Sequence, residues 1–107
     1  MIVHRNRWIW GRTWILVAEE GRGVVQISKE DDEEEAIIHN LSVIPGERGK
    51  GLGRKLVEMA EKIIKEEIGD VDIILYVETK NQDLIRWYEK LGYHVFDHDS
   101  EYTDMIK

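Results

Sequence analysis

A change in hydrophobic period in the middle of the chain limits the fold most. Residues Ala36–Pro45 form a nearly continuous apolar run, which is typical of a central strand covered on both faces. From Leu52 to Ile64 the apolar residues recur at helical spacing, and Gly69 ends that segment. Val71–Thr79 is again a strand pattern. This order predicts a βαβ unit with parallel strands and a right-handed crossover.

Strand patterns also precede this unit. Thr13–Glu20 and the run VVQIS from Val24 are separated by Gly21 and Gly23, and such a pair predicts an antiparallel hairpin. The N-terminal run Ile2–Trp10 predicts one more strand. The residues before the βαβ unit are therefore expected to add antiparallel strands to its sheet.

A second helix and two short strands are expected after the βαβ unit. Asn81 is a good helix cap, apolar residues follow it at helical spacing, and Gly92 suits the position just beyond the helix. YHVF from Tyr93 and YTDMIK from Tyr102 are typical of strands. We predict an α/β (α+β) fold whose mixed, mostly antiparallel sheet contains a central parallel βαβ pair. The 107 residues suffice for one domain, 1–107.

The composition excludes several classes of protein and chemistry. The chain has no cysteine, which excludes disulfides and thiolate chemistry. No segment resembles a signal peptide or reaches the roughly 20 apolar residues of a membrane span, so we expect a cytoplasmic protein without a membrane partner. The formal charge of −7 argues against non-specific nucleic-acid binding and favours a cationic partner. The acidic block Lys29–Glu35 is interpreted as a solvated loop.

The glycine-rich segment GERGKGLG, Gly46–Gly53, lies where the first helix begins. It lacks the lysine and hydroxyl residue of a Walker-type loop, because Leu52 follows Gly51, and Arg54 stands where a dinucleotide fingerprint needs glycine. What remains is a row of unobstructed amides at a helix start, which can bind a pyrophosphate. Basic residues such as Arg48 support this interpretation. A plain strand-to-helix turn without a ligand is the alternative.

Two motifs, in this order, resemble the signatures of the GNAT superfamily of acyl-CoA-dependent N-acetyltransferases. RGKGLG, Arg48–Gly53, fits the Q/R-x-x-G-x-G/A signature, and NQDLIRWYEKLGY, Asn81–Tyr93, fits the second. The resemblance covers roughly Thr13–Lys107 and implies that acetyl-CoA is the cosubstrate and that no metal is needed. The residues that it implies for coenzyme A binding are Leu41, Ser42, Val43, Arg48, Gly49, Lys50, Gly51, Leu52, Gly53, Arg54, Asn81 and Tyr88.

The same resemblance implies direct attack of an amine on the acetyl thioester. The backbone of Leu41–Val43 would bind the pantetheine amides and polarise the carbonyl. Tyr88 resembles the family's general acid, because a phenol matches the basicity of a thiolate leaving group; a core tyrosine is the alternative. His39 and Glu78 are the candidate general bases, with Tyr76 as a polar lining residue. A water chain to solvent is the third option for the base.

The chain departs from the family pattern near its N-terminus and in its second signature. Only a dozen residues precede Thr13, so the two helices that usually follow the first strand are expected to be missing. Leu84 stands where a small residue is common, and would tighten the packing near the pantetheine arm. Trp8 and Trp10 would share one strand face, which their rings would cover either within the monomer or through a dimer contact, and we favour the homodimer.

An open cleft without those helices suits an amine acceptor such as a small molecule, a protein terminus or a lysine. Two other functions are compatible with the pattern. The first is a non-catalytic acyl-CoA-binding sensor or partner subunit on the same fold, which the shortened N-terminal part favours. The second is a structural α/β domain whose glycine corner has no ligand.

Overall fold

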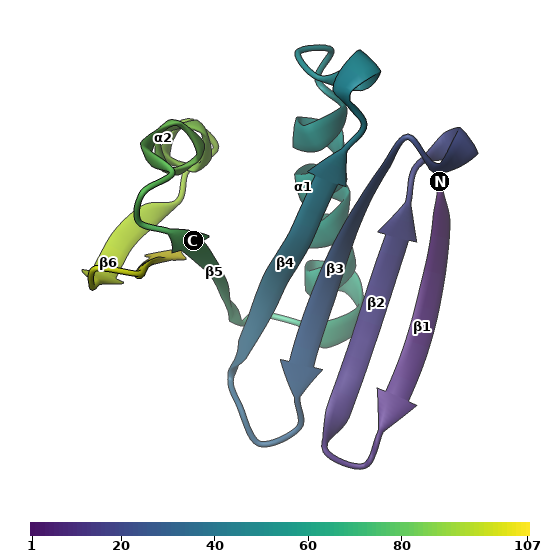
Figure 1. The fold of residues 1–107 in the computed structure, drawn as a ribbon. Coiled ribbons are helices and arrows are strands. Elements are labelled where there is room, and N and C mark those ends of the chain that lie inside the picture. Colours follow the sequence, from purple (N-terminus) through teal and green to yellow (C-terminus); the bar gives the residue numbers. More distant parts are fainter.

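A seven-stranded mixed sheet forms the centre of the structure, a computed structural model that describes residues 1–107 (Figure 1). Its strand order is β1-β2-β3-β4-β5-β7-β6, and β4 and β5 are the one parallel pair. The predicted mixed sheet with a central parallel pair is therefore confirmed. The strands are β1 Ile2–Trp8, β2 Gly11–Val17, β3 Gly23–Glu30, β4 Glu35–Val43, β5 Asp72–Glu78, β6 His94–His98 and β7 Tyr102–Ile106.

Two helices cover one face of this sheet. Helix α1, Leu52–Ile63, crosses from β4 to β5 and ends in a wider helical turn, Ile64–Ile68, and helix α2, Gln82–Lys90, connects β5 to β6. The amphipathic spacing seen in the sequence places buried residues of both helices in one continuous core with the inward side chains of the strands. Leu56 and Ala60 of α1 are fully buried in it, as is Met105 of β7.

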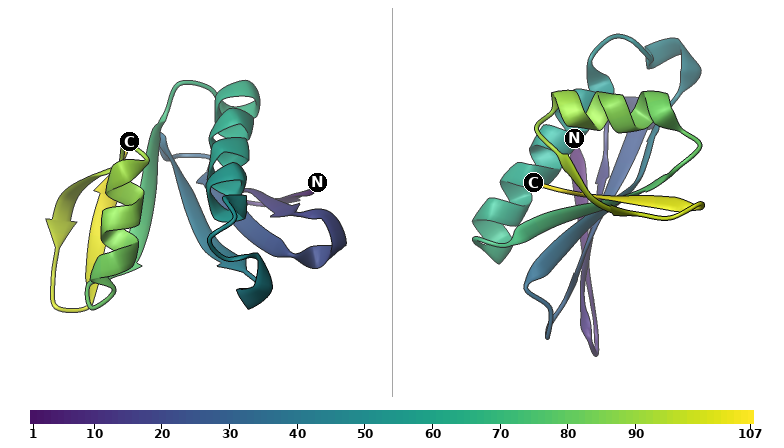
Figure 2. Two further views of the ribbon diagram at one scale, coloured as in Figure 1. Left: turned by 90° about the horizontal axis from the view of Figure 1, so that it is seen from above. Right: turned by 90° about the vertical axis from the view of Figure 1, so that its left-hand side faces the viewer.

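No helix covers the opposite face of the sheet, which we call the open face. Strands β1 and β2 are joined directly by Ile9 and Trp10, so the two helices that the family pattern places here are missing, as expected. Because strand side chains alternate, Ile15, Gln26 and Ile37 lie on the open face and are half-buried. Figure 2 shows this face without a covering layer in both views.

The sheet splits between its two parallel strands. β4 and β5 are paired only from Glu35 opposite Asp72 to Ile37 opposite Ile74, and beyond that point they diverge (Figure 1). Asn40 of β4 has a left-handed φ of 55° and interrupts the register with β3. Asparagine tolerates this conformation, and such a bulge bends a strand. The β5 side of β4 is consequently unpaired where the glycine-rich segment follows.

Two expectations from the sequence were wrong in detail. Lys29 does not lie in a solvated loop but ends the buried part of β3, because its ammonium donates to the carbonyls of Glu30 and Glu33 while its stem is buried. Trp10 lies in the turn after β1, so it does not share a strand face with Trp8.

Neither helix is long and apolar enough to cross a bilayer.

Candidate active site

A cavity of about 600 Å³ lies where β4 and β5 diverge. Its wall is formed by the end of β4, the glycine-rich segment, the first turn of α1 and the outer side of α2. All the residues predicted to bind coenzyme A line it except Lys50 and Tyr88. The lining residues are Leu41, Ser42, Val43, Glu47, Arg48, Gly49, Gly51, Leu52, Gly53, Arg54, Asn81, Leu84 and Trp87.

The glycine-rich segment presents a row of free backbone donors to this cavity. The amides of residues 49, 50, 51, 52, 53 and 54 donate to no acceptor in the chain. A helix start by itself leaves about four amides free. Gly49 and Gly51 have φ values of 78° and 83°, which extend the row backwards from the helix. No side chain caps the helix at Gly51, so the positive end of its dipole is open to a ligand.

The basic side chains around these amides are exposed and partly engaged. Nε of Arg54 donates to Oε1 of Glu58 at 2.7 Å, one turn along α1. Nε of Arg48 donates to the Val43 carbonyl at 3.2 Å and leaves its terminal nitrogens free. Exposed ion pairs of this kind are weak, so an incoming phosphate can compete with Glu58 for Arg54.

The β4 wall of the cavity depends on the bulge at Asn40. Before the bulge Ile38 faces the helices and His39 faces outward; after it Leu41 and Val43 pack against the core and line the cavity. A regular strand would have kept His39, Leu41 and Val43 on one face. The sequence analysis missed this bulge. An asparagine inside an apolar strand pattern was the available signal, because asparagine is depleted in strands.

Helix α2 supplies the opposite wall. Oδ1 of Asn81 accepts the amide of Leu84 at 3.3 Å, so Asn81 caps the helix and lines the cavity at the same time. Leu84 also lines the cavity. The ring of Trp87 lies against α1, 3.5 Å from where a Cβ on Gly53 would be. Trp87 was not among the residues predicted to bind coenzyme A, although it belongs to the apolar residues at helical spacing after Asn81.

Tyr88 lies behind this wall. Its side chain is buried and packs edge-on between Trp87 and Tyr93, with ring centroids 5.0 Å and 5.7 Å away. Burial raises the pKa of Tyr88 to about 12, so the phenol is protonated at neutral pH. The chain offers its hydroxyl no hydrogen-bond partner.

The candidate bases lie on the open face of the sheet. His39 and Tyr76 each stand two residues beyond the last paired positions of β4 and β5. Nε2 of His39 is 2.7 Å from Oγ of Ser28, and burial lowers the pKa of His39 from its ordinary value. Tyr76 is half exposed, and its pKa is raised by burial and then by neighbouring carboxylates, foremost that of Glu35.

Glu78 stands apart from these residues. It is exposed at the end of β5, where its carboxylate pairs with Nζ of Lys80 at 3.3 Å, and it does not line the cavity. The geometry therefore brings His39 near the splayed strands and leaves Glu78 in solvent. At the far end of the sheet Trp8 is 38% exposed and Trp10 is 69% exposed, so the homodimer stays a prediction.

Comparison with known proteins gives a family match over most of the chain. The family model described as Acetyltransferase (GNAT) family matches residues 3–93. A mycothiol acetyltransferase of Propionibacterium freudenreichii is 32% identical over 95 residues, which are 83% of this chain and 30% of that protein. The streptothricin acetyltransferase of Streptomyces lavendulae is 31% identical over 84 residues, 77% of this chain and 44% of that protein. The match thus spans less than half of the length of either relative.

Solved structures show the same fold. The PaiA N-acetyltransferase of Thermoplasma acidophilum, solved in complex with coenzyme A, has a TM-score of 0.73 and 27% identity, and the match covers 89% of this chain and 58% of that one. A nourseothricin acetyltransferase has a TM-score of 0.76 at 22% identity, with 92% of this chain and 65% of that one covered. With 91 residues inside the matched range 3–93, the chain belongs to the acetyltransferase (GNAT) family.

Proposed function

We propose that the chain is an acetyl-CoA-dependent N-acetyltransferase that moves an acetyl group directly from the thioester to a primary amine. The observation that carries this proposal is the row of free amides from residue 49 to residue 54, all of which except that of Lys50 belong to residues that line the cavity. These residues are exposed or half-exposed, so water accepts the hydrogen bonds of their amides in the free protein, and a ligand can replace it without breaking any bond within the chain. The pyrophosphate of coenzyme A is an acceptor of suitable charge.

The divergence of β4 from β5 supplies the proposed contacts to the rest of coenzyme A. The unpaired edge of β4 from Leu41 to Val43 offers amide and carbonyl groups to the pantetheine arm, much as a neighbouring strand would. On the α2 side, the pantetheine arm would contact Asn81, Leu84 and Trp87, which line the cavity. A β4 amide at Ser42 or Val43 would donate to the thioester carbonyl and stabilise the negative charge that develops on its oxygen.

The acceptor would reach the thioester from the open face, where His39 lies. As general base, His39 would take a proton from the acceptor, either from its ammonium form before attack or from the neutral amine as the new C–N bond forms, while Ser28 holds its ring. Tyr88 would return a proton to the departing thiolate from the helix side. Since Tyr88 is buried and does not line the cavity, its hydroxyl would have to come within hydrogen-bond reach of the sulfur in the bound complex.

The open face favours a cationic acceptor. A hollow of about 310 Å³ beside Ser28 is lined by Trp8 and by the carboxylates of Glu30, Glu33 and Glu35. None of these carboxylates forms an ion pair within the chain. An ammonium group gains from both carboxylates and an aromatic face. We therefore infer an amine with a positive charge near the reacting nitrogen, from a small molecule, a protein terminus or a lysine.

A non-catalytic acyl-CoA-binding subunit is the second candidate, and the position of Tyr88 outside the cavity wall favours it. Isothermal titration with acetyl-CoA and release of free coenzyme A thiol over a panel of amines test both functions. The panel should contain a monoamine, a diamine and short peptides with a free terminus or a lysine. Binding with thiol release supports the transferase, and binding without release for any amine supports the subunit. No binding contradicts both.

His39→Gln is expected to lower kcat/KM about 100-fold, the contribution typical of a general base. Burial lowers the pKa of His39 from its ordinary value of 6.5. The wild type should therefore lose kcat/KM as the pH falls through this lowered pKa and the imidazole becomes protonated. The variant should lack this acidic limb. The measurement is a pH profile of kcat/KM from pH 5 to 9, an interval that brackets the titration of histidine.

His94→Gln is the matched control, since His94 is an exposed histidine on β6 away from the cavity. It should keep both the rate and the acidic limb. If the limb disappears in Glu78→Gln and persists in His39→Gln, the base is Glu78. Persistence in both variants would leave water as the base.

A further inference from the structure

The proposed cofactor site spans two halves of the molecule that the split sheet joins only at one end. We call β1–β4 with α1 the N-terminal half and β5–β7 with α2 the C-terminal half. The pairing of Glu35–Ile37 with Asp72–Ile74 is their whole backbone ladder, and Figure 2 shows them diverging from it. The free amides belong to the N-terminal half, whereas Asn81, Leu84 and Trp87 belong to the C-terminal half.

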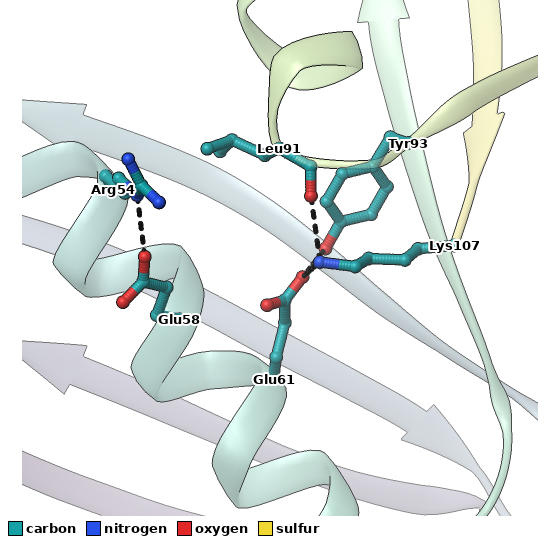
Figure 3. A network of polar contacts seen from close by, with 6 residues as sticks. All are labelled: Arg54, Glu58, Glu61, Leu91, Tyr93 and Lys107. Carbon is teal, nitrogen blue, oxygen red and sulfur yellow. Dashed lines mark hydrogen bonds and ion pairs between the residues drawn. The ribbon is translucent and has the colours of Figure 1, made fainter.

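Every side-chain hydrogen bond and ion pair that connects the two halves ends on Glu61 of α1 (Figure 3). Oε2 of Glu61 accepts the Tyr93 hydroxyl at 2.7 Å and Nζ of Lys107 at 3.0 Å. Nζ of Lys107 also donates to the Leu91 carbonyl at 2.8 Å, just after α2, and lies 5.4 Å from the centre of the Tyr93 ring. The other contacts between the halves are apolar packing, which is not directional.

Glu61 and Tyr93 are each connected to a part of the proposed site. Glu61 lies on the helix whose first turn carries the free amides, nine residues after Leu52 or about 13 Å along the axis. Tyr93 packs edge-on against Tyr88, and its amide donates to the Tyr88 carbonyl at 3.2 Å. Tyr93 is 1% exposed, so its hydroxyl is fixed on Glu61 by packing as well as by the hydrogen bond.

We propose that Glu61, Tyr93 and Lys107 form a clasp that sets the separation of α1 and α2 across the cofactor cavity. They are positioning residues: none of them lines the cavity, and they hold the phosphate anchor and Tyr88, against which Tyr93 packs, in register. This inference rests on the proposed function for its catalytic consequence. Its geometric content, the spacing of the two helices, does not.

Two ligands separate positioning from general stability. Acetyl-CoA would contact both halves, whereas inorganic pyrophosphate would contact only the amides of the N-terminal half. Loosening the clasp without unfolding the protein should therefore weaken acetyl-CoA binding alone. A residue that merely stabilises the fold would leave both affinities of the folded protein unchanged, or lower both together through the folded fraction.

Glu61→Gln and Tyr93→Phe are expected to weaken acetyl-CoA binding about tenfold, the factor that corresponds to one lost hydrogen bond to a charged group. Pyrophosphate affinity should stay at the wild-type value. The double variant should be no weaker than Glu61→Gln alone, because Tyr93→Phe removes one of the two contacts that Glu61→Gln already weakens. Lys107→Met should have a smaller effect, since the Lys107 side chain is 39% exposed and its pair is screened by solvent.

Glu67→Gln is the matched control. Glu67 also lies near the end of the α1 segment and accepts three hydrogen bonds, two from Arg5 and one from Trp14, which lower its pKa to about 2. All of its partners are in the N-terminal half. We expect this variant to lose stability in urea while it keeps the wild-type affinity for both ligands.

A second readout does not depend on the cofactor. The chain has no cysteine, so spin labels can be attached through Lys55→Cys on α1 and Glu89→Cys on α2, two exposed side chains. Pulsed electron paramagnetic resonance should show a shifted or broader distribution of distances between the two labels in the Glu61→Gln variant. The distribution should be unchanged in the Glu67→Gln variant. An unchanged distance with Glu61→Gln overturns the clasp. So does an unchanged acetyl-CoA affinity, or an equal loss for both ligands. Failure of the wild type to bind acetyl-CoA contradicts the proposed function and leaves the distance measurement to decide on the clasp.

Discussion

Gly51→Val is expected to weaken the binding of acetyl-CoA at least about 100-fold, the loss that corresponds to two charge-assisted hydrogen bonds. Gly51 has a φ of 83°, which a β-branched residue adopts only with strain. The variant should therefore turn the segment and move the neighbouring amides away from the phosphate position. Open space surrounds the site of the new side chain, so no clash with the core adds to the effect. Isothermal titration of the folded variant measures the loss.

Gly21→Val separates this effect from backbone strain in general. Gly21 has a φ of 66°, also has open space around it, and lies in the turn between β2 and β3 outside the cavity wall. Both variants should lose similar stability in urea. Only Gly51→Val should lose affinity, and equal affinities in the two variants would contradict the phosphate anchor.

The parts of the site that could be predicted from the sequence are those that local geometry determines. The glycines from Gly49 to Gly53 give a helix start without a side-chain cap, whatever the helix packs against. The segment alone therefore favours an anion site. Asn81 caps α2 through the amide of Leu84, three residues away. The alternating and helical periods likewise predicted the elements, because each reports which face of its own segment is buried.

The remaining features depend on contacts between distant segments. The β4–β5 pairing ends at Ile37, shortly before the bulge at Asn40, and no hydrophobic period in the sequence indicates either feature. Glu61 and Lys107 are 46 residues apart in the sequence, and nothing in the sequence distinguishes them from other charged surface residues. Only the fold shows that they form a contact. Lys29 was assigned to a loop because charge alone does not show that two backbone carbonyls are within its reach.

These long-range features also decide how the chemistry is divided. His39 would act from the open face and Tyr88 from the helix face, so base and acid lie on opposite sides of the split sheet. Burial shifts each pKa toward the protonation state from which the proposed role starts, but it also makes His39 a weaker base and Tyr88 a weaker acid. Burial keeps His39 neutral and able to accept a proton, and keeps Tyr88 protonated and able to donate one.

Tyr88→Phe is expected to lower kcat at least about 100-fold, the usual contribution of a general acid, with little change in the affinity for acetyl-CoA. The phenol has no hydrogen-bond partner in the chain, so its removal should change the stability in urea very little. A loss of rate without a loss of stability or binding would then belong to the hydroxyl itself. Single-turnover measurements with saturating acetyl-CoA separate the chemical step from product release.

Tyr102→Phe is the matched control, because Tyr102 is a half-exposed tyrosine on β7 outside the cavity wall, and its kcat should equal that of the wild type. The pH dependence adds an independent check. With its pKa raised to about 12, Tyr88 stays protonated far above neutral pH, so an acid role produces no alkaline loss of kcat between pH 7 and about 10. An unchanged kcat in Tyr88→Phe would make Tyr88 a core residue between Trp87 and Tyr93, and the departing thiolate would then be protonated by solvent at the divergence of β4 and β5.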